Sequence, residues 1–127
     1  MREPEAWLGS WYRYRRRADV TDPVRSTAGI DFDTFVRGSC NDPQPQFAQV
    51  GSQARFLHAR NGAGLDRLFR YERIESLTAY LGETLGREIV LPRLNVLPEA
   101  PMVLGPETRA RLRRHAAIDY ALYEGIL

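Results

Sequence analysis

An arginine and a serine near the start of the chain could together bind a phosphate group. Arg2 is followed by Pro4 and, eight residues after the arginine, by Ser10, in the pattern R-x-P-x5-S-W-Y. A guanidinium offers paired charged donors and a hydroxyl offers a neutral one, so both can converge on one anion. The same residues also suit a structural role, in which Arg2 is exposed and the small Ser10 lets neighbouring tryptophans pack. The spacing alone favours the structural interpretation.

Missing residue types exclude several other chemistries. All 18 basic residues are arginine, so the chain has neither a Schiff-base lysine nor a phosphate-loop lysine. Cys40 is the only cysteine, which excludes an internal disulfide and a cysteine-rich zinc site and favours an intracellular, reducing location. His58 and His115 are too far apart in the sequence, and too poorly supported by carboxylates, to indicate a metal site or a catalytic triad. We therefore expect no metal, and the catalytic residues remain unknown.

The elements that must position these side chains are mostly helices. A helix is predicted over residues 4–17, opened by a proline and carrying a tryptophan-rich apolar stripe. Asp31 is expected to cap a short helix whose apolar residues within 32–36 face inward. A third helix is predicted over residues 76–85, with a serine cap and a glycine stop. A last helix, preceded by a proline, is expected over residues 107–123.

Two short apolar segments predict a strand pair. Residues 56–59 and 65–71 flank the turn sequence 61–64, a pattern typical of a β-hairpin. Residues 91–101 contain three prolines and are expected to cross the surface in extended form. A parallel α/β core needs central strands beyond such a pair, so the tryptophan face of the first helix would lack a sheet. We therefore expect the isolated chain to be marginally stable or to aggregate.

The overall composition is that of one folded domain. The chain has 127 residues, of which 43% are hydrophobic and 27% are charged. Its net charge of +2 does not by itself indicate nucleic-acid binding. No apolar run approaches the roughly 20 residues that span a bilayer, and the first residues do not resemble a signal peptide. A cytoplasmic location and no membrane partner are the expectation.

A run of arginines and tyrosines offers a second way to bind phosphate. Residues 12–17 read Tyr-Arg-Tyr-Arg-Arg-Arg, which could stack bases and neutralise phosphates of a single-stranded nucleic acid. The alternative, which the pattern favours, is a helix end whose arginines balance the helix dipole. Nucleic acid is therefore not the expected partner.

Five segments resemble, in sequence order, motifs of sulfotransferases that use 3′-phosphoadenosine 5′-phosphosulfate (PAPS). The pattern from Arg2 to Tyr12 resembles the family's 3′-phosphate-binding motif. The other four are similar to motifs of Golgi-type and bacterial members: residues 31–36 to "sFeeFv", Gln53 with residues 65–75 to "Q … vDfigRfEnLeed", residues 91–95 to "lPhlN", and residues 119–123 to the closing "yaeDyelf". The resemblance covers essentially the whole chain.

The resemblance implies specific site residues. Arg2 and Ser10 match contacts to the 3′-phosphate of PAPS. Arg70 and Glu72 match the "RfE" stretch and are second-rank candidates, either beside the cofactor or in a structural ion pair with each other. Family members also carry a 5′-phosphosulfate-binding loop and a catalytic base ahead of the arginine–serine motif. Since neither is found here, residues 1–127 are expected to form one partial domain, the C-terminal part of a sulfotransferase, inactive alone.

The resemblance also implies a fold and a reaction. The fold would be α/β, of the P-loop nucleotide-hydrolase type, mostly helical in this part with the short strand pair. The reaction would be sulfuryl transfer from PAPS to a hydroxyl or amine of a small-molecule or carbohydrate acceptor. Two alternatives stay open: a small arginine-rich nucleic-acid-binding module, and a noncatalytic interaction protein whose exposed Trp7, Trp11 and Phe35 dock on a partner or on a second copy.

Overall fold

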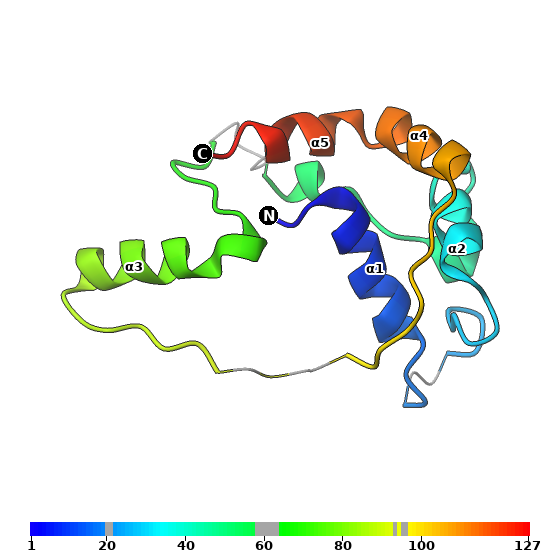
Figure 1. The fold of residues 1–127 in the computed structure, drawn as a ribbon, viewed down its shortest axis with the longest axis horizontal. Helices are drawn as coiled ribbons and strands as arrows, with labels where there is room; N and C mark the ends of the chain where they lie inside the picture. The colour runs from blue at the N-terminus through cyan, green and yellow to red at the C-terminus, as the bar shows by residue number, and fades with distance from the viewer. Residues whose placement is uncertain (20–21, 58–63, 93, 95–96) are drawn as a thin grey trace.

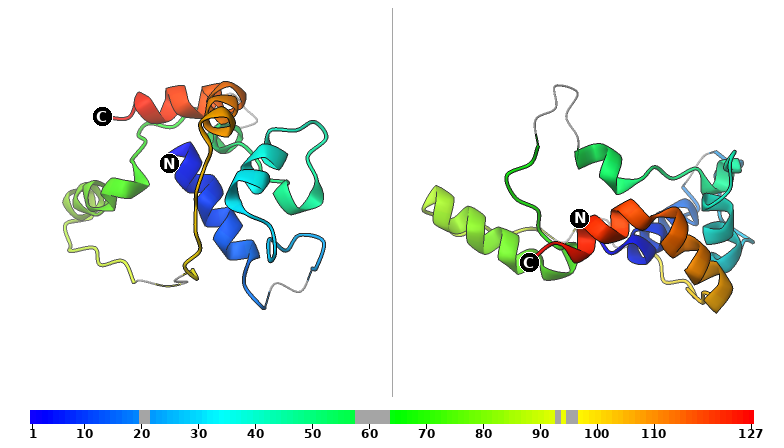
Figure 2. Two further views of the ribbon diagram at one scale, coloured as in Figure 1. Left: turned by 45° about the vertical axis from the view of Figure 1, so that its right-hand side comes forward. Right: turned by 90° about the horizontal axis from the view of Figure 1, so that it is seen from above.

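Helices dominate the part of the chain that the structure describes. The computed structural model describes residues 1–19, 22–57, 64–92, 94 and 97–127. Its α-helices are α1 (Pro4–Arg15), α2 (Phe32–Ser39), α3 (Ile74–Leu85), α4 (Pro106–His115) and α5 (Ala117–Glu124), and its short 3-10 helices are η1 (Gln46–Ala48), η2 (Gln53–Leu57) and η3 (Tyr71–Arg73). Helices α1, α2, α4 and α5 lie together, whereas α3 projects to one side (Figures 1 and 2).

The first two helices begin at the residues that the sequence indicates. Pro4 occupies the first position of α1, and the Glu3 carboxylate accepts the Ala6 N–H at 2.8 Å. Asp31 caps α2 by accepting the Thr34 N–H at 2.7 Å. Both helices are therefore confirmed, although α1 ends two residues before the predicted limit.

The later helices depart from the predicted boundaries. Helix α3 begins at Ile74 rather than at Ser76, because η3 leads directly into it. Its predicted stop is confirmed, since Gly86 is left-handed with a φ of 64°. The predicted last helix is divided in two at Ala116, whose φ of −100° and ψ of 28° interrupt the regular turn.

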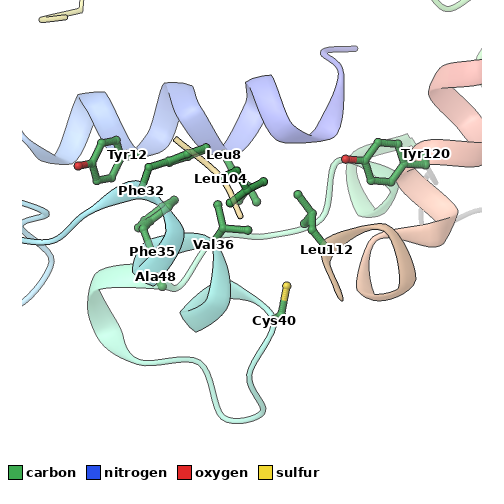
Figure 3. Close-up of a cluster of buried hydrophobic side chains, with 10 residues drawn as sticks. All are labelled: Leu8, Tyr12, Phe32, Phe35, Val36, Cys40, Ala48, Leu104, Leu112 and Tyr120. Carbon is green, nitrogen blue, oxygen red and sulfur yellow. The ribbon is translucent and has the colours of Figure 1, made fainter. Parts of the chain in front are cut away.

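The buried core joins four helices through aromatic and aliphatic side chains (Figure 3). Tyr12 of α1 lies 5.4 Å from the Phe32 ring and 5.5 Å from the Phe35 ring, measured between centroids. The Tyr12 hydroxyl donates to the Ile30 carbonyl at 2.7 Å, which satisfies its polar end. The inward orientation predicted for residues 32–36 is thus confirmed. The docking role suggested for an exposed Phe35 is wrong, because that side chain is fully buried.

The predicted α/β fold is wrong, and the predicted strand pair is absent from the described residues. Phe56 and Leu57 end the 3-10 helix η2, and the described residues of 65–71 carry no strand. The alternation in these segments does not mark a buried face, since Phe56 is 77% exposed and Leu65 is 56% exposed. Residues 61–63 of the expected turn, His58, Arg93 and Asn95 lie outside the described residues.

A different backbone pairing involves the same segment. The Met1 amino group donates to the Phe69 carbonyl at 2.7 Å, and the Tyr71 N–H donates to the Met1 carbonyl at 2.8 Å. This alternation is the hydrogen-bond pattern of a single parallel bridge centred on Arg70. The start of the chain therefore lies beside the segment that leads into α3 (Figure 1).

The chain that returns from α3 to α4 is anchored at two points. The Met102 side chain lies against α1 at Gly9, where a Cβ would come within 2.6 Å of its sulfur. Asp33 of α2 accepts the Gly105 N–H at 2.9 Å and the Thr108 hydroxyl at 3.0 Å. Asp33 thereby supplies the N-terminal cap of α4 from another helix.

Phe35 provides a test of the core. We expect Phe35→Ala to lower the free energy of unfolding by about 3–5 kcal/mol, because it leaves a cavity among Tyr12 and Phe32. Urea denaturation followed by circular dichroism measures this loss. The matched control is Phe56→Ala, at a side chain that is 77% exposed and should change stability by no more than about 0.5 kcal/mol. Equal losses in the two variants would contradict the assigned core.

Asp33 predicts how stability changes in acid. The Gly105 N–H, with the Thr108 and Arg37 hydrogen bonds, holds the pKa of Asp33 below its ordinary value. A carboxyl whose folded-state pKa is depressed stabilises the fold above its unfolded pKa, about 4, and loses that contribution as the pH falls through the folded pKa. We expect Asp33→Asn to lower the urea midpoint at pH 7.

The same substitution should matter less as the solution is acidified. The difference between wild type and Asp33→Asn should shrink as the pH is lowered below about 4. The control is Glu83→Gln, at an exposed position of α3. A difference that stays constant down to about pH 2 would contradict the role of the ionised carboxylate.

Candidate functional site

The main chain of Arg2 is fixed by the side chain of Gln53. The Arg2 N–H donates to the Gln53 Oε1 at 2.9 Å, and the Gln53 Nε2 donates to the Arg2 carbonyl at 2.8 Å. Gln53 is 7% exposed, so this two-bond pairing is shielded from water. Because only backbone atoms of Arg2 take part, its guanidinium stays available for other contacts.

Gln53 is in turn held by a buried carboxylate of α5. Asp119 accepts hydrogen bonds from the Ser52 hydroxyl at 2.7 Å, the Gln53 N–H at 3.1 Å and the Ala54 N–H at 2.8 Å. Asp119 is 5% exposed, and three donors offset the cost of burying its charge. A continuous chain of contacts therefore leads from α5 through η2 to the backbone of Arg2.

The guanidinium of Arg2 stacks on an aromatic ring. Its central carbon lies 3.7 Å from the centroid of the Tyr71 ring. Stacking uses the face of a guanidinium and leaves the N–H donors in its plane able to bind a second group. Within the described residues, the Arg2 side chain has neither a carboxylate nor a carbonyl partner. Its donors can therefore meet an anion.

Ser10 lies in the second turn of α1 and is partly exposed. Among the described residues, its hydroxyl has no hydrogen-bond partner within the chain. Arg2 lies just ahead of α1 and Ser10 lies within it, as the predicted helix over residues 4–17 implies. Both side chains are accessible donors, but the contacts within the chain do not join them.

The N-terminus of α1 is occupied by carboxylates. The Glu3 side chain accepts the Ala6 N–H, and Glu72 accepts the Glu3 N–H at 3.0 Å. Burial alone would raise the pKa of Glu72, but hydrogen bonds from the Glu3 N–H and the Tyr123 hydroxyl hold it below its ordinary value. Carboxylates therefore already accept these backbone donors, which makes this helix end unfavourable for a phosphate.

The expected ion pair between Arg70 and Glu72 is not formed in the described part of the chain. The two side chains instead meet at Tyr123 of α5. The Arg70 guanidinium carbon lies 4.7 Å from the Tyr123 ring centroid, while the Tyr123 hydroxyl donates to Glu72 at 3.0 Å. Arg70 has an extended backbone, whereas Glu72 lies in the 3-10 helix η3 that follows it. Arg70 and Glu72 thus fasten the segment before α3 to α5.

The arginine run at the end of α1 makes contacts within the chain. Arg15 donates to the carbonyls of Phe47 at 2.9 Å and Gln49 at 2.6 Å. Arg16 donates to the Tyr12 hydroxyl at 2.8 Å, and Arg17 pairs with Asp19. These guanidinium groups hold neighbouring loops, so they have fewer donors left for nucleic-acid phosphates.

Other reactive groups stay outside this site. Cys40 is buried, and burial raises the pKa of its thiol, which disfavours the reactive thiolate. In the described ranges, no group of three or more histidine, cysteine or acidic residues is arranged to hold a metal ion. None of the described helices combines the length and apolar character needed to cross a bilayer.

Comparisons with models of protein families, with curated proteins and with solved structures find no match to this chain.

Asp119 is the testable support of the site. We expect Asp119→Asn to lower the free energy of unfolding by about 1–3 kcal/mol, because an amide cannot accept from all three donors in the same geometry. Chemical denaturation measures the loss. Asp66→Asn, at an exposed carboxylate, is the control and should be near neutral. A neutral Asp119→Asn variant would contradict the support proposed for η2.

Proposed function

We propose that the chain belongs to a PAPS-dependent sulfotransferase and that Arg2 and Ser10 bind the 3′-phosphate of the nucleotide. The observation that carries the proposal is that Arg2, just ahead of α1, and Ser10, within α1, both keep side-chain donors unused by the described residues. The described fold lacks the sheet that the family resemblance implies. The proposal therefore rests on this donor pair and on the order of the sequence motifs.

The support given to Arg2 suits a binding role. Gln53 fixes its backbone through two hydrogen bonds, and Tyr71 fixes the plane of its guanidinium. Fixing both before a ligand arrives reduces the conformational entropy lost on binding. A guanidinium can then give two parallel charged hydrogen bonds to a phosphate, and the Ser10 hydroxyl can add a neutral one. Glu3 and Glu72 occupy the neighbouring backbone donors, which leaves the side chains to do the binding.

In this proposal the chain positions the nucleotide. PAPS would supply the sulfuryl group, and the acceptor would be a hydroxyl or amine of a small molecule or carbohydrate. Arg2 and Ser10 would hold the end of the nucleotide remote from the transferred group, so they contribute orientation rather than proton transfer. No described residue is assigned as the catalytic base. Arg70 and Glu72 are left out of the binding pair, because each is engaged with Tyr123.

Nucleotide binding to the chain tests the proposal directly. Adenosine 3′,5′-bisphosphate carries the 3′-phosphate, whereas adenosine 5′-monophosphate lacks it. We expect the bisphosphate to bind at least about tenfold more tightly in isothermal titration calorimetry, as one charge-assisted contact of about 1.5–3 kcal/mol requires. Equal affinities for the two nucleotides would contradict the proposal.

Substitutions locate the contact. Arg2→Gln should remove most of the preference for the bisphosphate while keeping both backbone bonds to Gln53. Ser10→Ala should weaken bisphosphate binding a few-fold, because a neutral hydrogen bond contributes about 1 kcal/mol. Arg87→Gln, at an exposed arginine after α3, is the matched control and should bind like wild type. An unchanged preference in Arg2→Gln would assign the phosphate to other residues.

A further inference from the structure

A cavity lies between α1, α4, α5 and residues 50–55. Its volume is about 430 Å³, within the range of roughly 300–1,000 Å³ typical of small-molecule sites. Neither Arg2 nor Ser10 lines it, so it is separate from the proposed phosphate site. Its apolar wall includes the side chains of Trp7, Val50 and Leu112. The Trp7 indole N–H donates to the Gly51 carbonyl at 3.4 Å, which ties the ring to the cavity wall.

The inner polar groups of this cavity are already engaged. The Ser39 hydroxyl donates to the Val36 carbonyl at 2.7 Å, and the Gln44 amide donates to the Ser39 carbonyl at 2.6 Å. Asp119 is the single carboxylate among the described lining residues, and it accepts from Ser52, Gln53 and Ala54. A ligand that needed a free carboxylate or hydroxyl at the base would find none there.

Two basic side chains at the cavity remain available. Arg55 and His115 line it and are exposed to solvent. Neither has a hydrogen-bond or ion-pair partner within the described residues. Arg55 can bind a carboxylate through two parallel hydrogen bonds, and the imidazole of His115 can donate one more. The cavity therefore presents the positive charge of Arg55 at its solvent-exposed side and uncharged side chains along its apolar wall.

We infer that this cavity binds a small, planar, apolar carboxylate, with its ring against Trp7 and its carboxylate on Arg55. The cavity volume limits the size of the ligand, and the apolar wall favours an apolar ring system. The side-chain donors of Arg55 and His115 favour a negatively charged polar end. This inference does not rest on the proposed nucleotide function, because the two sites share no residue.

The probe is 2-naphthoate, compared with the uncharged 2-naphthalenemethanol. Isothermal titration calorimetry should give at least about tenfold tighter binding of the carboxylate, corresponding to one charge-assisted contact. In nuclear magnetic resonance spectra, 2-naphthoate should shift the Trp7 indole N–H and the amides of Gly51 and Ala116, which line the cavity. Amides of α3 should not move, because α3 contributes no lining residue.

Variants separate this contact from adventitious binding. Arg55→Gln should weaken 2-naphthoate at least fivefold and leave 2-naphthalenemethanol unchanged, and its exposed position makes a folding defect unexpected. Arg87→Gln is the matched control and should bind both probes like wild type. Absence of 2-naphthoate binding, or shifts outside the cavity, would overturn the inference. Equal affinity for the two probes, or no effect of Arg55→Gln, would overturn the assignment of the ligand as an anion.

Discussion

The hydrogen bonds to the buried carboxylate of Asp119 are the interaction on which both proposed sites depend. It gathers three donors from Ser52, Gln53 and Ala54 and so joins α5 to η2. Through Gln53 it fixes the backbone of Arg2, and it also lines the cavity that contains Trp7 and Arg55. A desolvated charge with three donors strongly favours one geometry, since each lost bond leaves a buried group unsatisfied. The two proposed sites therefore have a common support.

The arginines differ in how their donors are used. Arg15 and Arg16 donate to carbonyls of loops that carry little regular structure. A guanidinium can reach several carbonyls at once because its five donors have a fixed planar arrangement. The arginines at the proposed sites, Arg2 and Arg55, keep their donors free of carbonyls and carboxylates in the described structure. Local density of arginine is thus a poor guide to anion binding here, and the engagement of each side chain decides it.

Local signals were sufficient for some elements and insufficient for others. Pro4 and Asp31 act within a few residues of themselves, and so the starts of α1 and α2 could be predicted. The break at Ala116 precedes the turn that brings Asp119 to η2, a contact 65–67 residues away in the sequence. No local pattern reports such a contact. The hairpin prediction failed for a related reason, because the backbone partner of Phe69 is Met1.

The candidate site was predicted in the same uneven way. The positions of Arg2 just ahead of the first helix and of Ser10 within it follow from the predicted helix start at Pro4. The role of Gln53 does not, because its partner lies 51 residues earlier and a glutamine has no pattern that marks it as a backbone anchor. The expected pairing of Arg70 with Glu72 assumed that neighbours in sequence are neighbours in space. Both side chains instead contact Tyr123, near the C-terminal end of the chain.

The placement of α3 has a consequence for how the sequence can vary. None of the side chains of α3, all of which are described, is buried, and the chain that follows rejoins the core where Met102 meets Gly9. After this contact, Asp33 accepts the Gly105 N–H and so fixes the start of α4. Loop closure depends only weakly on length. The α3 excursion can therefore gain or lose residues at small cost to the core, whereas the hydrogen bonds from Gly105 and Thr108 to Asp33 hold the chain where it enters α4.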